Sequence, residues 1–319
     1  MNAFSWRRIA ALGAAALAAL SACAGLEKPA VQPLYADVNG ARLAYVEEGS
    51  GSPVVLVHGS LSDLRTWEPT RALLAKHYRV IAYSQRYFGK EPWLAGGPKI
   101  GVPGQSVDLA AFIRSLGVGP VHLVGWSSGG TVAIHVALEH PELVKSAFVY
   151  EPPLADAVTD EADRRTVADD RAAAFGPAVQ ALRAGDEAGA LRAVLDAVEA
   201  RSGVLETWPP SRQAIAMENA RTLPLEFFDS DPPPPIGCAQ LARLKPPVTV
   251  ARGSGTRVSY RLMADAAAAC IGGRRHVVVA DARHLWPADE PRAFSEEVRR
   301  FLSQEAFAKP TWLGSRRFP

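Results

Sequence analysis

Short apolar runs alternate with longer stretches of helical character along most of this chain, and this alternation limits the fold more than any other feature. The strand candidates lie at residues 54–57, 79–82, 121–124, 145–150, 248–251 and 276–280. The helix candidates lie at residues 65–76, 107–116, 128–139, 259–269 and 292–301. Strands that alternate with helices pair in parallel, with the helices packed on both faces. The sequence therefore predicts an α/β protein with a mostly parallel sheet flanked by helices.

A hairpin is expected ahead of the first of these strands. Residues 34–48 alternate between apolar and polar side chains on either side of Asn39-Gly40. An Asn-Gly pair tolerates the positive φ angles that a two-residue hairpin turn needs. The sheet should therefore begin with a hairpin.

The alternation stops at residues 152–245, where no convincing strand occurs. Helical stretches lie there instead, near residues 163–182, 187–200 and 211–221, followed by a stiff run of four prolines at 232–235. This segment is predicted to be a helical cap inserted after the strand that ends near Tyr150. Residues 34–151 and 246–306 then form the core, and residues 307–319 form a C-terminal tail. A chain of 319 residues is long enough for one core domain with such an insertion.

The N-terminal residues have the pattern of a bacterial lipoprotein signal peptide. Arg7 and Arg8 precede twelve apolar residues, 9–20, a run too short to span a bilayer but typical of a secretory signal. Leu20-Ser21-Ala22-Cys23 then resembles the lipobox, in which the cysteine thiol accepts a lipid. Residues 1–22 are expected to be removed, Cys23 to be lipidated and residues 23–33 to form a tether. The alternative is an ordinary signal peptide with a cysteine there by chance.

This assignment implies a location in the bacterial cell envelope, with the protein held by its lipid to the periplasmic face of a membrane. Ala24 rather than Asp follows the cysteine, which favours the outer membrane over the inner. In that oxidising compartment the other two cysteines, Cys238 and Cys270, could form a disulfide.

Charge and composition exclude some partners. Apart from Arg7 and Arg8, the chain has 33 basic and 33 acidic residues, so nothing favours binding to nucleic acid. No cluster of His and Cys has the spacing of a zinc site, and no metal or cofactor is predicted. The oligomeric state is left open.

A nucleophile motif joins the strand at 121–124 to the helix that follows it. Gly125-Trp126-Ser127-Ser128-Gly129 has the form G-x-S-x-G, in which the serine lies on a sharp, strained strand-to-helix turn. Ser127 is therefore the candidate nucleophile. The backbone N–H of Ser128 begins the helix and is a candidate donor to an oxyanion. The Ser128 hydroxyl is not expected to react.

A second oxyanion donor is expected after the strand at 54–57. His58-Gly59-Ser60 follows that strand directly, and the Ser60 N–H is the favoured donor, with the Leu61 N–H as the alternative. The alternative interpretation is a glycine turn after a buried strand, with no part in catalysis. His58 is interpreted as a structural residue.

His284 is the candidate general base among seven histidines. It lies in a loop after the last predicted strand and before the final helix, where its ring could reach both a serine and an acid. The other histidines lie at predicted strand starts, in helices, at helix ends or, for His58, in the turn just described.

These motifs together resemble the α/β-hydrolase superfamily over residues 35–302. The resemblance is greatest to the capped branch, which includes carboxylesterases, C–C hydrolases, epoxide hydrolases and haloalkane dehalogenases. It implies an α/β-hydrolase fold with a Ser–acid–His triad. The last two classes use Asp as nucleophile, so Ser127 excludes them. The segment Tyr83 to Gly89 matches the family pattern only in part.

The acid of the triad is the weakest part of the resemblance. The family usually has a Gly-x-x-Asp loop after the strand at 248–251, but this chain has Thr256 at the acid position. Some members place the acid one strand earlier, where this chain has Glu151, and Glu151 is the favoured candidate. The alternatives are Asp281, Asp229, Asp231 and a dyad without an acid.

The resulting hypothesis is a cofactor-independent serine hydrolase that forms an acyl-enzyme intermediate. Its substrate is expected to be a small, apolar carboxylic ester, with a lactone, an amide or a C–C bond left open. Aromatic residues in the cap and near the motifs support the apolar group: Trp126, Trp208, Phe227, Phe228 and Trp286. Alternative functions are a cofactor-free peroxidase or perhydrolase and a non-catalytic, membrane-anchored binding protein.

Overall fold

The computed structural model describes residues 31–93, 96–272 and 276–307. The signal segment at 1–22, Cys23, most of the tether and nearly all of the tail lie outside these residues. Among the helices it describes, none is both long enough and apolar enough to cross a membrane.

Eight strands form one sheet in the order β1-β2-β4-β3-β5-β6-β7-β8. β1 and β2 pair antiparallel, β2 also pairs antiparallel with β4, and every other neighbouring pair is parallel. This arrangement confirms the predicted fold class. The strands are β1 Leu34–Val38, β2 Ala41–Glu48, β3 Pro53–Val57, β4 Arg79–Tyr83, β5 Val121–Trp126, β6 Val144–Tyr150, β7 Val248–Gly253 and β8 His276–Val279.

The turn between β1 and β2 has the geometry that its two residues favour. Asn39 has a φ of 47° and Gly40 a φ of 72°, so both adopt the left-handed conformation of a two-residue hairpin. The predicted hairpin is therefore present.

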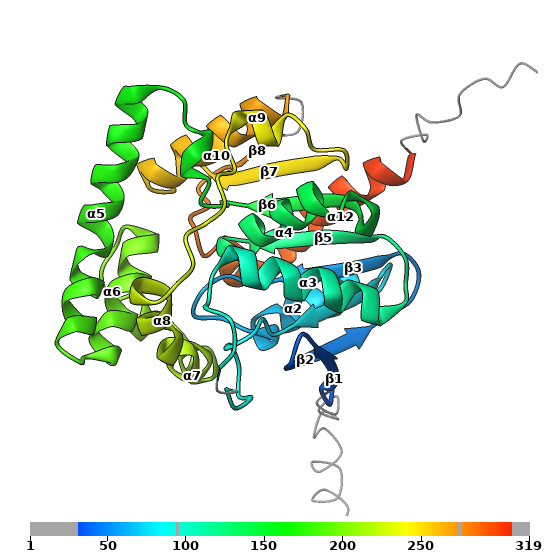
Figure 1. Cartoon of the computed structure of the whole chain (residues 1–319), viewed down its shortest axis with the longest axis horizontal. Coiled ribbons are helices and arrows are strands. Elements are labelled where there is room, and N and C mark those ends of the chain that lie inside the picture. Colours follow the sequence, from blue (N-terminus) through cyan, green and yellow to red (C-terminus); the bar gives the residue numbers. More distant parts are fainter. Residues whose placement is uncertain (1–30, 94–95, 273–275, 308–319) are drawn as a thin grey trace, which may run out of the picture. The chain divides into compact units, whose positions relative to one another are not determined.

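Helices cover both faces of the sheet (Figure 1). On one face α3 (Val102–Leu116), α4 (Ser128–Glu139) and α10 (Val258–Ile271) pack on alternate strand residues such as Val55 and Leu123. On the other face α2 (Glu68–Leu74) and α12 (Pro291–Phe307) pack on the intervening residues. Strand residues thus contribute to two apolar cores because successive side chains point to opposite faces.

The start of α3 corrects the sequence interpretation, which placed it at residue 107. The helix begins five residues earlier, at Val102, with a proline in its first turn. Proline is tolerated there because the first N–H groups of a helix have no partner inside it. The first turn also contains Pro103 and Gly104, which are poor helix formers, so the pattern at 107–116 marked only part of the helix.

Helices and 3-10 turns, without a strand among the described residues, occupy the chain between β6 and β7 (Figure 1). Asp160 and Asp186 accept backbone N–H groups at the starts of the two longest helices there. The helices are α5 Glu161–Arg183, α6 Glu187–Glu199, α7 Pro210–Asn219, α8 Leu223–Phe228 and α9 Cys238–Leu241. The last two are too short for a periodic pattern, which is why the sequence analysis missed them. The other short elements are η1 Leu64–Trp67, η2 Pro141–Leu143, η3 Ala155–Ala157, η4 Leu205–Thr207, η5 Ala220–Thr222 and α11 Trp286–Asp289.

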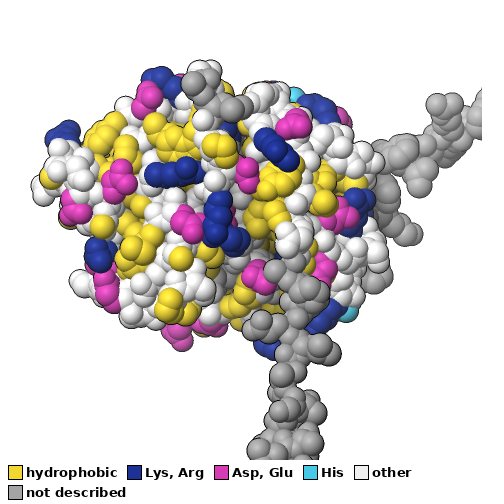
Figure 2. Space-filling view, turned by 90° about the horizontal axis from the view of Figure 1, so that it is seen from below, with side chains coloured by type: hydrophobic (Ala, Val, Ile, Leu, Met, Phe, Trp, Pro, Cys, Tyr) yellow, Lys and Arg dark blue, Asp and Glu magenta, His cyan; other side chains and the backbone are white. Residues whose placement is uncertain are grey.

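The inserted helices, called the cap below, share a core with the sheet domain. Leu191, Val194 and Val198 of α6 belong to the same apolar cluster as Trp126 at the end of β5. Cys238 in α9 forms a disulfide with Cys270 in α10. Figure 2 shows acidic and basic side chains scattered among apolar ones over one face, without a large region of one sign.

Candidate active site

The candidate residues lie in loops that leave one edge of the sheet. Ser60 follows β3, Ser127 follows β5, Glu151 follows β6, Thr256 follows β7 and His284 follows β8. These five strands run parallel, so their carboxyl ends meet at the same edge. Residues far apart in the sequence are brought together by this arrangement.

Ser127 lies on a strained turn between β5 and α4. Its φ of 54° and ψ of −129° fall in a region that residues other than glycine rarely adopt. The turn passes very close to the strand beside it: a Cβ atom at Gly129 would lie 2.3 Å from the His58 carbonyl oxygen. The small residues of the motif are thus required by contact between two backbones.

The Glu151 carboxylate is hydrogen-bonded to the candidate base. Its Oε2 lies 2.7 Å from His284 Nδ1, and Glu151 is fully buried. The Gly253 N–H donates to Oε1 at 2.9 Å, and the Thr256 hydroxyl donates to Oε2 at 2.9 Å. Thr256, which occupies the usual acid position, therefore binds the carboxylate supplied by the neighbouring strand.

The other three acids considered from the sequence lie elsewhere. Asp281 is exposed, and its N–H donates to the Ser254 hydroxyl. Asp229 pairs with Lys99 on the surface. The Asp231 N–H donates to the Ile100 carbonyl. Among the described residues, only Glu151 has a carboxylate hydrogen-bonded to the His284 ring.

His284 is held by contacts on its ring and on its backbone. The Tyr260 ring stacks on it with the centroids 4.1 Å apart and the planes 12° apart. The Trp126 indole N–H donates to the His284 carbonyl at 2.8 Å. The next backbone N–H, that of Leu285, donates to Glu199 Oε1 at 2.8 Å.

Neither Tyr260 nor Glu199 was predicted from the sequence. Tyr260 lies in α10, and Glu199 is the last residue of α6 in the cap. Neither is part of a local motif, because each reaches His284 only through the tertiary fold. The burial of Glu199 is seen only in the structure, so no sequence signal marked this residue.

The candidate oxyanion donors flank the nucleophile. Ser60 and Ser128 line a cavity together with Ser127. Within the described part of the chain, no hydrogen bond uses the N–H of Ser60, Leu61 or Ser128. Unused backbone donors beside a serine are what stabilisation of an oxyanion requires. The Ser60 side chain points to another partner, since its hydroxyl donates to Glu226 Oε2.

His58 is a buried structural residue. Its Nε2 accepts the Gln85 N–H at 3.0 Å, which leaves the Nδ1 hydrogen to donate to the Gly59 carbonyl at 2.8 Å. Burial lowers the pKa of His58 to about 4, so the ring is neutral near pH 7. This environment agrees with the structural interpretation of His58.

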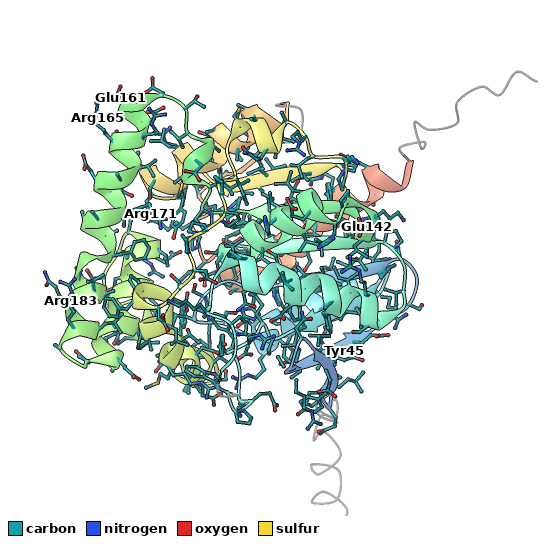
Figure 3. The ribbon with its side chains drawn as sticks, viewed as in Figure 1. Tyr45, Glu142, Glu161, Arg165, Arg171 and Arg183 are labelled. Carbon is teal, nitrogen blue, oxygen red and sulfur yellow. A yellow bond between two sulfur atoms is a disulfide. The ribbon has the colours of Figure 1, made fainter. Side chains whose placement is uncertain are left out.

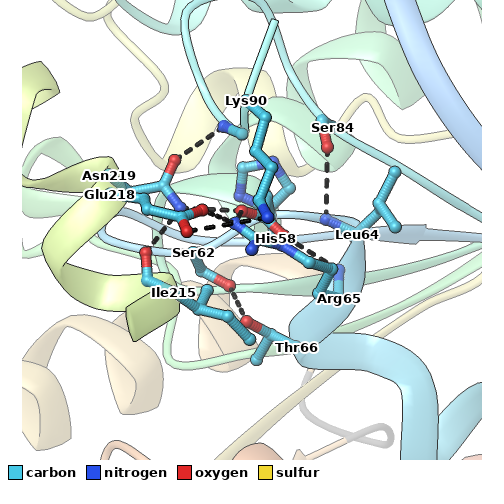
Figure 4. A network of polar contacts seen from close by, with 12 residues as sticks. His58, Ser62, Leu64, Arg65, Thr66, Ser84, Lys90, Ile215, Glu218 and Asn219 are labelled. Atoms are coloured by element: carbon cyan, nitrogen blue, oxygen red, sulfur yellow. Dashed lines mark hydrogen bonds and ion pairs between the residues drawn. The ribbon is translucent and has the colours of Figure 1, made fainter. Parts of the chain in front are cut away.

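A polar network beside His58 joins the cap to the core (Figure 4). Asn219 at the end of α7 donates to Asp63 Oδ2 at 2.8 Å and accepts the Gly89 N–H at 2.7 Å. Arg65 bridges Asp63 and Glu218, each with a distance of 2.6 Å. The network fixes one end of the cap over the loops that follow β3 and β4.

Two cavities meet at Ser127. The larger has about 480 Å³ and the smaller about 50 Å³, and Ser60, Ser127, Val194 and Val198 line both. His284 lines the smaller cavity, with Trp126 and Trp208. Phe227 lines the larger one. Most of the other lining side chains are apolar.

Two of the five aromatic residues suggested for the substrate, Trp286 and Phe228, do not line either of these two cavities. Trp286 is buried, with its ring 5.3 Å from that of Phe294 and 5.2 Å from that of Tyr150. Phe228 is 51% exposed.

Among the described residues, no group of His, Cys, Asp and Glu could hold a metal ion.

The family model described as alpha/beta hydrolase fold matches residues 52–291 of the chain. This chain belongs to the alpha/beta hydrolase fold family. The match covers every strand from β3 to β8, and the cap.

This alpha/beta hydrolase also resembles individual proteins. It is 35% identical over 106 residues to (E)-2-((N-methylformamido)methylene)succinate hydrolase from Acinetobacter baylyi, covering 33% of this chain and 39% of that protein. It is 36% identical over 109 residues to a candidate non-heme bromoperoxidase from Mycobacterium tuberculosis, covering 34% of this chain and 40% of that protein. The matched stretches thus span well under half of these relatives.

A likeness of fold extends over most of the chain. A thermophilic esterase from Thermogutta terrifontis superposes with a TM-score of 0.67 and 21% identity, over 86% of this chain and 99% of the esterase. At that identity the comparison shows the shared fold alone.

Proposed function

We propose that this alpha/beta hydrolase is a serine hydrolase that cleaves a small carboxylic ester through an acyl-enzyme intermediate. The observation that carries the proposal is the pair His284–Glu151, at 2.7 Å, beside a cavity that both Ser127 and His284 line. The strained backbone of Ser127 supports the same role, because the family's nucleophile occupies such a turn.

Each group has a defined task in this proposal. A carboxylate can only accept, so His284 directs its Nδ1 hydrogen to Glu151 and keeps Nε2 free to take the Ser127 proton. Ser127 Oγ then attacks the ester carbonyl, and the N–H groups of Ser60 and Ser128 stabilise the oxyanion. His284 returns the proton to the leaving alcohol, and water releases the acid in the second half of the reaction.

The two cavities differ in volume, and each can hold one half of the ester. The leaving alcohol takes its proton from His284, and His284 lines the smaller cavity. The alcohol therefore occupies the smaller cavity, and the acyl group occupies the larger one. A short alcohol and a longer acyl chain fit these volumes.

The test is labelling with a fluorophosphonate, which reacts only with an activated serine, together with hydrolysis of methyl esters followed by pH-stat. Ser127→Ala should abolish labelling and turnover while the protein stays folded. Ser128→Ala should retain most of both, because only its backbone N–H takes part. The reverse order for the two variants would assign the nucleophile to Ser128.

A cofactor-free perhydrolase is the second candidate, favoured by the likeness to the candidate non-heme bromoperoxidase. The same acyl enzyme would react with hydrogen peroxide in place of water and release a peracid. Peracid formation from a methyl ester and peroxide, faster than hydrolysis of the ester, would support this candidate. A folded wild-type protein that neither labels nor turns over would favour the binding-protein alternative.

We also propose that Cys23 carries a lipid that holds the mature protein to the cell envelope. Support comes from the residues before it, Leu20-Ser21-Ala22, and from the apolar run at 9–20. Cys23→Ser should abolish palmitate labelling and release the protein from membranes. Wild-type protein that takes up no palmitate and fractionates as soluble would refute the proposal.

A further inference from the structure

Arg171 places a positive charge in the larger cavity at Ser127. This residue lies in α5 of the cap (Figure 3). It lines the cavity of about 480 Å³ with Ser127 and Ser128. It also lines an adjoining cavity of about 270 Å³, which shares Ser128, Pro153 and Glu226 with the first. A guanidinium in an otherwise mostly apolar cavity needs an explanation, because desolvating a charge costs free energy.

The Arg171 charge has no ion-pair partner among the described residues. Asp170, its neighbour in sequence, is bound by Nε and Nη2 of Arg257, at 3.0 and 2.9 Å. The ring of Phe175, one helical turn along α5, lies 5.7 Å from the Arg171 guanidinium carbon. This contact orients the side chain but leaves its N–H groups available.

Glu226 is the other charged residue that lines the larger cavity, and its oxygens are already occupied. The Ser60 hydroxyl donates to Oε2, and the Thr222 hydroxyl donates to Oε1 at 2.6 Å. Burial raises the pKa of this carboxyl, which favours its neutral form. Glu226 is therefore hydrogen-bonded to Ser60 and Thr222 and does not neutralise Arg171.

We propose that the acyl group of the substrate ends in a carboxylate, and that the Arg171 guanidinium binds this carboxylate while Ser127 attacks the ester at the other end. The inference rests on the proposed function, because it takes Ser127 as the reacting group. Arginine suits the task because its planar fork binds a carboxylate with two parallel hydrogen bonds. The substrate class is thus a half-ester of a dicarboxylic acid that fits a cavity of about 480 Å³.

The test compares monomethyl glutarate with methyl pentanoate, which differ only in a terminal carboxylate against a methyl group. Wild-type enzyme should prefer monomethyl glutarate in kcat/KM. Arg171→Gln should lower the ratio of the two kcat/KM values by about 10- to 100-fold, the scale of a lost charge-assisted hydrogen bond. Arg171→Lys should recover part of the ratio.

The matched control is Arg183→Gln, because Arg183 lies in the same helix with its side chain exposed to solvent. This variant should keep both kcat/KM values at the wild-type level. A wild-type enzyme that favours methyl pentanoate, or an Arg171→Gln variant with an unchanged ratio, would overturn the assignment.

Binding to the Ser127→Ala variant separates this inference from the proposed function. Glutarate binding, measured by calorimetry, does not depend on turnover. Binding that Arg171→Gln weakens by about tenfold or more supports the anion site even if no ester is hydrolysed. Absence of measurable glutarate binding in a folded Ser127→Ala protein refutes the anion site, whatever the outcome of the hydrolysis assay.

Discussion

Glu151 is the site residue whose stability depends most on hydrogen bonds from the groups around it. It is fully buried, has a φ of 47° and supplies the carboxylate that His284 Nδ1 contacts. A buried carboxylate is stable only when its oxygens are hydrogen-bonded, and Gly253, Thr256 and His284 provide three such contacts. Thr256 thus completes the environment of an acid that lies on the neighbouring strand.

Glu151→Gln should lower kcat by about 10³- to 10⁴-fold, because an amide cannot both hold the His284 tautomer and stabilise the imidazolium. Methyl ester hydrolysis by pH-stat checks this result, with circular dichroism to establish folding. Asp281→Asn is the control and should behave as wild type, since Asp281 is exposed. Full activity of Glu151→Gln would leave His284 without this acid and favour a dyad.

At the scale of elements, the end of α6 is joined to the loop that carries His284. Glu199 accepts the Leu285 N–H at 2.8 Å, and the Arg283 guanidinium donates to the Glu199 carbonyl at 2.8 Å. Glu199 is 2% exposed. The cap therefore contacts the side chain of the residue before His284 and the backbone of the residue after it, so its position affects the position of the ring.

Glu199→Ala should lower both kcat and the melting temperature, because it leaves the buried Leu285 N–H without an acceptor. Such a loss destabilises by about 1 to 3 kcal/mol. Glu199→Gln should restore most of both, since the amide oxygen can still accept the N–H. The control is Glu187→Ala on the exposed first turn of the same helix. Equal losses in the Gln and Ala variants would mean that the charge matters, not the hydrogen bond.

A second link between elements is the Cys238–Cys270 disulfide, which joins α9 to α10 across a sequence separation of 32 residues. Closing a loop of this length restricts the unfolded chain and stabilises by about 3 to 4 kcal/mol in the chain-entropy model. The double variant Cys238→Ser, Cys270→Ser should show a loss of this size in urea unfolding. Titration of two free thiols in the denatured, unreduced wild type would contradict the prediction.

At the scale of the whole molecule, two buried neutral histidines make stability depend on pH. Burial lowers the pKa of both His58 and His122 from the ordinary 6.5 to about 4. Between these values the unfolded chain binds protons that the folded chain does not. The stabilisation is therefore complete above pH 6.5 and is lost as the pH falls toward 4.

The free energy of unfolding should be lower at pH 5 than at pH 7.5 by about 2 kcal/mol for each of these two histidines. Urea unfolding at the two pH values measures the difference. His122→Asn should remove about 2 kcal/mol of it, the contribution of that ring. His77→Gln, at an exposed position, should leave it unchanged. A stability that does not change between pH 7.5 and 5 would show that neither ring is held neutral.

The sequence by itself determined the features that depend on short stretches of chain. The Asn39-Gly40 turn, the order of strands and helices, and the strand–turn–helix around Ser127 all follow from local backbone preference and side-chain spacing. The disulfide partners could also be proposed, because only two cysteines remain besides Cys23. The resemblance to the family implied the acid after β6. The location of the protein and the role of Cys23 remain predictions.

Only the tertiary structure decided which distant groups meet at the site. β6, β7 and β8 are neighbours in the sheet, and this order brings Glu151, Thr256 and His284 together. The contacts of Glu199 and Tyr260 with the His284 loop, and the position of Arg171 at the cavity, depend on how the cap and α10 pack. Such contacts leave no periodic or motif signal in a single sequence. Their energy comes from burial and pairing between segments that chain connectivity keeps far apart.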